Sequence, residues 1–223
     1  MSRRTVYLSI ALILLVALSL AAWNALRKRS GIEAVSTAGA LPPTPTPTPI
    51  VIPISDGFDY PVGNTKRVTE ANDGDGWYNA QNFGENNHLG EDWNRESGGN
   101  TDCGLPVYAV SKGTIIFAGE EGKGWGKVII IRHRLPDGTL VETLYGHLSS
   151  IVRSGGEVER RERIGQIGDA GGAYPCHLHF ELRLSDCPSW GLKGTGYSDV
   201  RVGWTDPSEF IDARRSLPRK ANL

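Results

Sequence analysis

The sequence predicts a mainly β domain, a compact antiparallel sheet with little helix, preceded by one apolar segment. Short runs of β-branched and aromatic residues alternate with turns, and the 223 residues include 28 glycines and 13 prolines. Helical periodicity is weak except near the C-terminal end. This length favours one domain with appendages, and the net charge of −1 provides no basic patch for binding nucleic acid.

The N-terminal part of the chain reads as a membrane segment over residues 5–26, after a short cytoplasmic end at 1–4. Its 22 residues carry no charge, and as a helix they would cover roughly 33 Å, enough for the hydrocarbon core of a bilayer. We expect an uncleaved anchor with the domain outside the cell membrane, because the run is longer than a usual signal core. The alternative is a secreted protein, cut after a signal peptide at the small residues Ser19 and Ala21.

A Pro/Thr-rich linker is expected over residues 27–57, which contain "LPPTPTPTPIVIP". Alternating proline and threonine favours the extended polyproline conformation and cannot form a helix or the interior of a sheet. Such a segment is a semi-rigid spacer of about 3 Å per residue. It would hold the following domain away from the membrane, and a disordered linker would have the same reach.

The folded β domain is expected over residues 58–212, with a C-terminal tail at 213–223. Residues 106–119 are expected to form two strands about a turn at Lys112-Gly113. A hairpin follows, with strands at 127–134 and 139–148 and with Asp137-Gly138 in its turn. Next come a charged turn and a short strand within 157–168, and then a long strand at 177–184. A short helix follows near the end, because Asp206 can cap it and Pro207 suits its first position.

Two short motifs hold candidate metal ligands. In "CHLHFEL" the strand places His177 and His179 on one face, since alternate side chains share a face. In "HLGED" an extended segment would likewise place His88 and Asp92 together. The donors of His88, Asp92 and His179 suit Zn²⁺ with a fourth position for water, which is the catalytic pattern. A histidine pair on a strand is also compatible with ordinary polar surface.

A third motif, "LYGHLSS", places His147 at the end of a strand. Neither His147 nor His177 is needed as a ligand in this scheme. Two histidines beside a metal-bound water would orient it, accept its proton and stabilise an oxyanion. Their unperturbed pKa near neutrality suits this role. The remaining histidine, His133, reads as a polar residue at a strand end.

The motifs "HLGED", "YGHLS" and "HLHFEL", in this order, resemble the lysostaphin-type, or LytM-like, zinc metallopeptidases. The resemblance covers roughly residues 76–211 and includes the connecting "GLPVYAVSKGTI" and "WTDPSEFI". It implies the LytM-like fold of duplicated hybrid motif, with one Zn²⁺ in a groove. The residues that it implies are His88, Asp92 and His179 as metal ligands, with His147 and His177 as catalytic residues beside a metal-bound water.

The activity that the resemblance implies is that of a zinc metalloendopeptidase that hydrolyses peptide cross-links of bacterial peptidoglycan with zinc-activated water. Two alternatives remain: a catalytically silent relative that binds the wall or activates another hydrolase, and a structural protein tethered across an envelope space. The bond cleaved stays open, and loops such as 76–87 and 188–203 would select it. Strand alternation directs Glu91, between the first two ligands, away from the site.

The three cysteines are an odd number, so at least one lies outside any intramolecular disulfide. Cys176 immediately precedes the histidine pair, at a position where the family commonly has proline, and alternation points it away from the metal. An exported location favours a disulfide of Cys176 with Cys103 or Cys187. A redox-sensitive thiol beside the site is the alternative, and spacing does not decide which pair forms.

Overall fold

The computed structural model describes residues 23, 50–63 and 76–216 of the chain. The chain divides into two units, 1–48 and 49–223, and Trp23 is the one described residue of the first. The predicted membrane segment therefore lies, except for Trp23, outside the described residues. Within the described part of the chain, no helix combines the length and the apolar character needed to cross a membrane.

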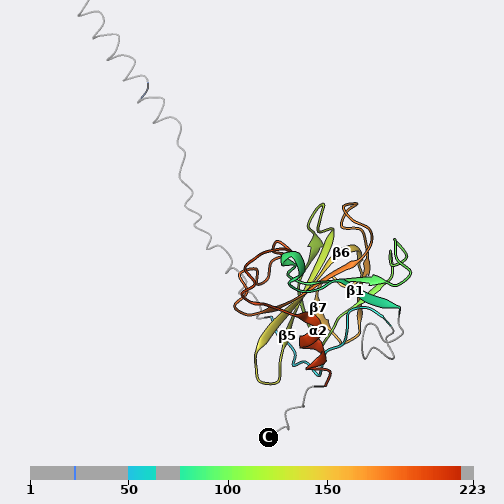
Figure 1. Cartoon of the computed structure of the whole chain (residues 1–223). Coiled ribbons are helices and arrows are strands. Elements are labelled where there is room, and N and C mark those ends of the chain that lie inside the picture. The colour runs from blue at the N-terminus through green and yellow to red at the C-terminus, as the bar shows by residue number, and fades with distance from the viewer. Residues whose placement is uncertain (1–22, 24–49, 64–75, 217–223) are drawn as a thin grey trace, which may run out of the picture. The chain divides into compact units, whose positions relative to one another are not determined.

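The second unit is built on an antiparallel sheet that has ten strands in the described part of the chain (Figure 1). The strands are β1 (Trp77–Gln81), β2 (Glu91–Arg95), β3 (Pro106–Tyr108), β4 (Gly113–Glu120), β5 (Lys127–Arg134), β6 (Leu140–Ile151), β7 (Gly156–Val158), β8 (Arg163–Ile167), β9 (Leu178–Leu184) and β10 (Trp204–Thr205). Their main order is β1-β2-β9-β6-β5-β4-β7, while β10 pairs with β9, and β8 joins β3 to β6. The prediction of a mainly β antiparallel fold is confirmed.

The predicted hairpin is formed by β5 and β6, which pair antiparallel along nearly their whole length. Asp137 stabilises its turn, since its Oδ1 accepts a hydrogen bond from the Thr139 backbone N–H at 2.8 Å. Gly138 supplies a φ of +95°, which other residues rarely adopt. The strands that flank Lys112-Gly113 are also present, but β3 pairs with β8, and β4 pairs with β5 and β7.

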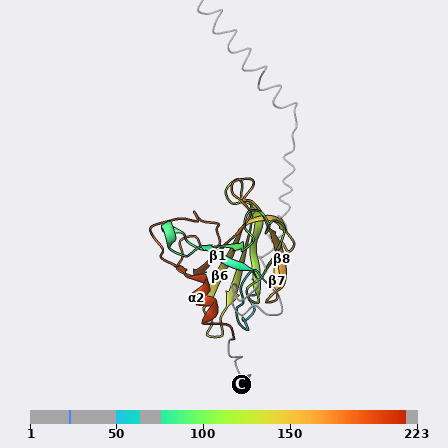
Figure 2. The ribbon, with the colours of Figure 1, turned by 45° about the vertical axis from the view of Figure 1, so that its right-hand side comes forward.

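The predicted C-terminal helix is α2 (Pro207–Asp212). Asp206 caps it by accepting the Glu209 backbone N–H at 2.9 Å. Figures 1 and 2 show α2 beside the sheet in both views. Phe210 of α2 packs edge-on against Phe58, with ring centroids 5.2 Å apart. Apolar burial thus fastens the short helix to the domain.

Strand β9 separates the hydrophobic core from the face that carries the candidate site. Leu178, Phe180 and Leu182 are fully buried in the core. The intervening side chains lie on the opposite face. There His179 stands directly between two neighbouring strands, since it is the register partner of Asp92 on β2 and of Gly146 on β6.

Candidate metal centre

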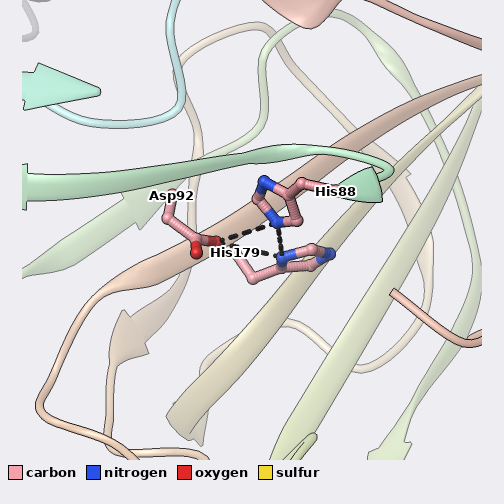
Figure 3. Close-up of side chains that lie close together, drawn as sticks. All are labelled: His88, Asp92 and His179. Atoms are coloured by element: carbon pink, nitrogen blue, oxygen red, sulfur yellow. Dashed lines mark hydrogen bonds and ion pairs between the residues drawn. The ribbon is translucent and has the colours of Figure 1, made fainter. Parts of the chain in front are cut away.

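Three of the predicted residues meet at one point of this face (Figure 3). The Nε2 of His88 lies 3.0 Å from the Nδ1 of His179. The Oδ1 of Asp92 lies 3.0 Å from the same Nδ1 and 3.3 Å from the His88 Nε2. The three donor atoms therefore form a nearly equilateral triangle of lone-pair-bearing groups.

The segment from His88 to Asp92 was predicted to be extended throughout, but only its last two residues belong to a strand. A 3₁₀ turn, η1 (Glu85–Asn87), ends just before His88, and β2 begins only at Glu91. His88 itself is extended, with φ −64° and ψ 131°, and forms an isolated bridge with Tyr197. Gly90 lets the chain cross β9 closely, because a Cβ there would stand 2.4 Å from the Phe180 carbonyl oxygen.

The size of the triangle fits a metal ion. Bonds of about 2.0–2.2 Å to nitrogen and oxygen place two ligands of a tetrahedral site roughly 3.3 Å apart. The observed edges of 3.0–3.3 Å approach this value. His88 and His179 also cannot both direct a proton into the 3.0 Å gap between them, so at least one presents a lone pair. The donor set of two imidazoles and one carboxylate suits Zn²⁺.

The electrostatics of the triangle also favour a cation. Burial alone would raise the pKa of Asp92, but hydrogen bonds from His179 and His88 hold the pKa well below its usual range. Burial alone would lower the pKa of His179, but hydrogen bonds to Asp92 and Glu181 outweigh it and raise the pKa to about 9. The two carboxylates thus stabilise positive charge at this point, whether it is a proton or a metal ion.

His147 reaches the same cleft through a bulge in β6. Tyr145 and Leu148 both point into the core, although two residues, Gly146 and His147, lie between them. In a regular strand, residues on one face are separated by an odd number of residues, so one extra residue is inserted here as a bulge. His147 has a φ of +63°, which is uncommon for a residue with a side chain. Without the bulge, its imidazole would lie on the core face with Tyr145.

The backbone fixes how His147 and His177 present their rings. The Nδ1 of His147 lies 3.3 Å from the Trp125 carbonyl oxygen, and the Nδ1 of His177 lies 2.9 Å from that of Pro175. A carbonyl oxygen only accepts, so each Nδ1 donates, and in the neutral form of each ring the lone pair lies on Nε2. Burial and the charges of His179 and His177 lower the pKa of His147 to about 3. Its ring is therefore neutral at pH 7.

All five predicted residues lie at or beside one open cleft of about 580 Å³. Four of the five line it directly, and the lining is formed by Gln81, Asp92, Lys123, Gly124, Trp125, His147, Tyr174, Pro175, His177, His179, Thr195, Gly196 and Tyr197. His88 lies beneath the wall, with its ring stacked on Tyr197 at a centroid distance of 4.9 Å.

The aromatic residues Trp125, Tyr174 and Tyr197 of the cleft were not predicted from the sequence. Each follows closely upon glycine in a glycine-rich loop, and that is the signal that would have indicated them.

Packing decides where the side chains of Glu91 and His133 lie. Glu91 points away from the site, as predicted, and its Oε1 accepts the Ser208 backbone N–H at 3.2 Å. His133 lies near the end of β5, as predicted, but its burial was not expected. Its side chain is fully buried and bonds the Lys112 carbonyl oxygen at 3.0 Å and the Thr143 hydroxyl at 2.9 Å. Facing strands cover it, which single-strand reasoning did not foresee.

The cysteine question is decided by the fold. Cys103 and Cys176, 73 residues apart, form a disulfide, and Cys187 is a buried free thiol. The bond ties the loop after β2 to the residue that precedes His177. Cys176 is therefore part of the scaffold of the cleft, and its sulfur is bonded away from the ligand triangle.

Comparison with known proteins points to one family. The model of Peptidase family M23 matches residues 86–189. The DD-carboxypeptidase/endopeptidase Mpg of Neisseria meningitidis serogroup B is 41% identical over 85 residues, which are 38% of this chain and 19% of that protein. The peptidoglycan DD-endopeptidase ShyA of Vibrio cholerae is 31% identical over 115 residues, 51% of this chain and 26% of that protein. The chain thus spans about a fifth of the length of the first relatives it matches.

A third relative is matched over most of its own length. Lipoprotein NlpD of Yersinia enterocolitica is 35% identical over 81 residues, which are 36% of this chain and 78% of that protein. The segment 86–189 matched by the family model contains the ligand triangle together with His147 and His177. The chain belongs to peptidase family M23.

Proposed function

We propose that this protein is a zinc-dependent endopeptidase that hydrolyses peptide cross-links of bacterial peptidoglycan. The observation that carries the proposal is the convergence of His88, Asp92 and His179, with two further histidines beside them, in one open cleft. Three ligands with neighbouring acid–base groups are typical of catalytic metal sites. A structural site would be closed by a fourth protein ligand.

The residues of the cleft divide the chemistry between them. Zn²⁺ held by the triangle would supply a Lewis acid that polarises a carbonyl group and acidifies water. One of the two histidines, His147 or His177, would accept the proton of the attacking water at Nε2, because each Nδ1 is committed to a backbone carbonyl. That ring would stabilise the oxyanion while it carries the proton and would then deliver the same proton to the leaving amine.

The wall substrate and the location are supported by the relatives. Mpg and ShyA are named as endopeptidases, and the name of ShyA specifies peptidoglycan. A cleft with aromatic walls suits an extended peptide, whose backbone packs against flat rings. We infer an extracytoplasmic domain, anchored in the cell membrane through residues 5–26. A disulfide in the domain agrees with an oxidising compartment.

The test uses the full chain, because Ser55 and Ile52 before the predicted domain boundary contact the domain. Bound zinc is quantified, and release of new amino termini from purified peptidoglycan is followed for the wild type, His179→Ala and His147→Ala. We expect one zinc per chain in the wild type and in His147→Ala, less in His179→Ala, and cleavage by the wild type alone. A zinc-loaded wild type that cleaves no wall type would instead support a silent wall-binding relative.

A further inference from the structure

On β9 a buried ladder of side chains continues from His179 away from the cleft. Glu181 and Arg183 follow at alternate positions, so they share its face. Both are fully buried. Charged side chains are rarely buried to this extent unless they are paired and hydrogen-bonded. Each of these two buried side chains is therefore expected to have specific hydrogen-bond partners.

The two carboxylate oxygens of Glu181 have different partners. Oε1 accepts from the Nε2 of His179 at 2.9 Å. Oε2 accepts from the Nε of Arg183 and from the indole N–H of Trp204, each at 2.8 Å. The contact to Oε1 requires a proton on the His179 Nε2. In the neutral ring, the form that can bind a metal, the lone pair then lies on Nδ1, the atom that faces His88 and Asp92.

Arg183 connects this carboxylate to the wall of the cleft. Its Nη1 donates to the carbonyl oxygens of Ser189 and Leu192, and its Nη2 donates to that of Lys193 at 2.6 Å. The loop that contains these carbonyls runs directly into the cleft-lining residues 195–197. One guanidinium thus holds both the partner of His179 and the loop that leads to the wall.

We propose that Glu181 and Arg183 are positioning residues of the metal centre: Glu181 fixes the His179 ring with its Nδ1 lone pair directed at the metal, and Arg183 fixes Glu181 relative to the cleft wall. This inference rests on the metal site of the proposed function. Carboxylates that accept from the second nitrogen of a ligating histidine set its tautomer and strengthen it as a ligand.

A neighbouring carboxylate–arginine pair, Glu142 on β6 and Arg132 on β5, contacts the same loop and provides a matched control. Glu142 is also fully buried, accepts from Arg132 at 3.0 Å, and accepts the Gly191 backbone N–H at 2.7 Å. Among its described contacts, none reaches the metal ligands. Replacing Glu142 by glutamine therefore removes a buried carboxylate beside an arginine, and perturbs the same loop, without touching His179.

The substitution Glu181→Gln is expected to move the proton of the His179 ring from Nε2 to Nδ1. Two donors, Arg183 and Trp204, face the Oε2 position, so the glutamine oxygen will occupy it and the amide NH₂ will face His179. Because an NH₂ group only donates, the Nε2 of His179 must then accept. The ring proton moves to Nδ1, where it blocks the lone pair needed for the metal.

The test measures zinc affinity of the full chain by competition with a chelator, and the position of the His179 proton in the zinc-free protein by ¹⁵N NMR. We expect Glu181→Gln to bind zinc about 10- to 100-fold more weakly, with the proton on Nδ1, and Glu142→Gln to bind zinc as the wild type does. Wild-type affinity in Glu181→Gln, an equal loss in Glu142→Gln, or a neutral ring protonated on Nε2 would overturn the proposal.

If Glu181→Gln does not fold, Trp204→Phe replaces it, since that change removes one donor to Oε2 without leaving a buried charge unpaired. A few-fold loss of zinc affinity is expected for Trp204→Phe, and unchanged affinity would overturn the proposal. Zinc affinity is independent of peptide cleavage. A wild type that binds zinc but cleaves no wall therefore counts against the proposed function alone.

Discussion

At the scale of single residues, two backbone details bring the site together. Gly90 allows the His88–Asp92 segment to pass over β9, and the left-handed conformation of His147 turns its ring from the core to the cleft. Both positions cost conformational freedom or strain, which the surrounding strands must offset. Strain at a predicted catalytic histidine agrees with a functional role for its placement.

His147→Ala is expected to reduce peptide cleavage by about 10²- to 10⁴-fold, because it removes a general acid–base group. Zinc content should stay unchanged, since His147 lies outside the ligand triangle. Turnover of a peptidoglycan fragment, measured together with zinc by atomic absorption, checks both. A loss of zinc in this variant would mean that His147 is itself a ligand.

Gly90→Ala is expected to destabilise the domain by about 1–3 kcal/mol, because the new methyl group would meet the Phe180 carbonyl oxygen at 2.4 Å. It should also weaken zinc binding by separating Asp92 from His179. Urea unfolding and chelator competition measure the two effects. Gly155→Ala is the control, since its Cβ would meet nothing within 4 Å, and a similar loss there would remove the packing argument.

At the scale of elements, β9 is the central strand of the site, because one of its faces packs in the hydrophobic core and the other carries the predicted ligand His179. Its neighbour β2 brings Asp92 into register with His179, and its neighbour β6 places Gly146, the residue before His147, opposite His179. The strand begins two residues after Cys176, and the disulfide to Cys103 fastens that end of the cleft. Short strands and a covalent bond thus position residues that are far apart in the chain.

Removing the disulfide with the pair Cys103→Ala and Cys176→Ala is expected to lower the free energy of unfolding by about 2–4 kcal/mol, since the bond closes a long loop. Urea denaturation measures the change. A thiol reductant should reproduce the loss in the wild type and have no effect on the double variant. Sensitivity of the double variant to the reductant would point to Cys187 instead.

At the scale of the whole molecule, a fully buried histidine links stability to pH. Burial lowers the pKa of His133 to about 4, whereas the unfolded chain has its ordinary value near 6.5. Between these values the unfolded state binds a proton that the folded state does not. The contribution of His133 to stability therefore falls as the pH drops from about 6.5 to 4, and it is constant above 6.5.

The size of this effect is about 3 kcal/mol, from about 1.36 kcal/mol for each pKa unit. His133→Gln should make the free energy of unfolding flatter between pH 6.5 and 4, even though it removes hydrogen bonds and lowers stability at every pH. Urea titrations at several pH values give both slopes. Parallel slopes in the wild type and the variant would show that His133 is not the group responsible.

The sequence by itself determined the strand pattern, the β5–β6 hairpin, the capped helix and the segments that carry the site. These features depend on local chemistry, such as alternation along a strand, a glycine in a turn and an aspartate at a helix start. For the same reason His177 and His179 were placed on one face without any knowledge of their neighbours.

Only the tertiary structure decided what lies opposite each of these residues. The disulfide partner of Cys176, the burial of His133 and the aromatic walls of the cleft all join segments distant in the chain. Glu181 lies on the same strand as His179, but its partner Trp204 comes from β10. The bulge at His147 reverses the face that alternation would assign to it. Such features follow from strand pairing and packing across the sheet, and no local pattern encodes them.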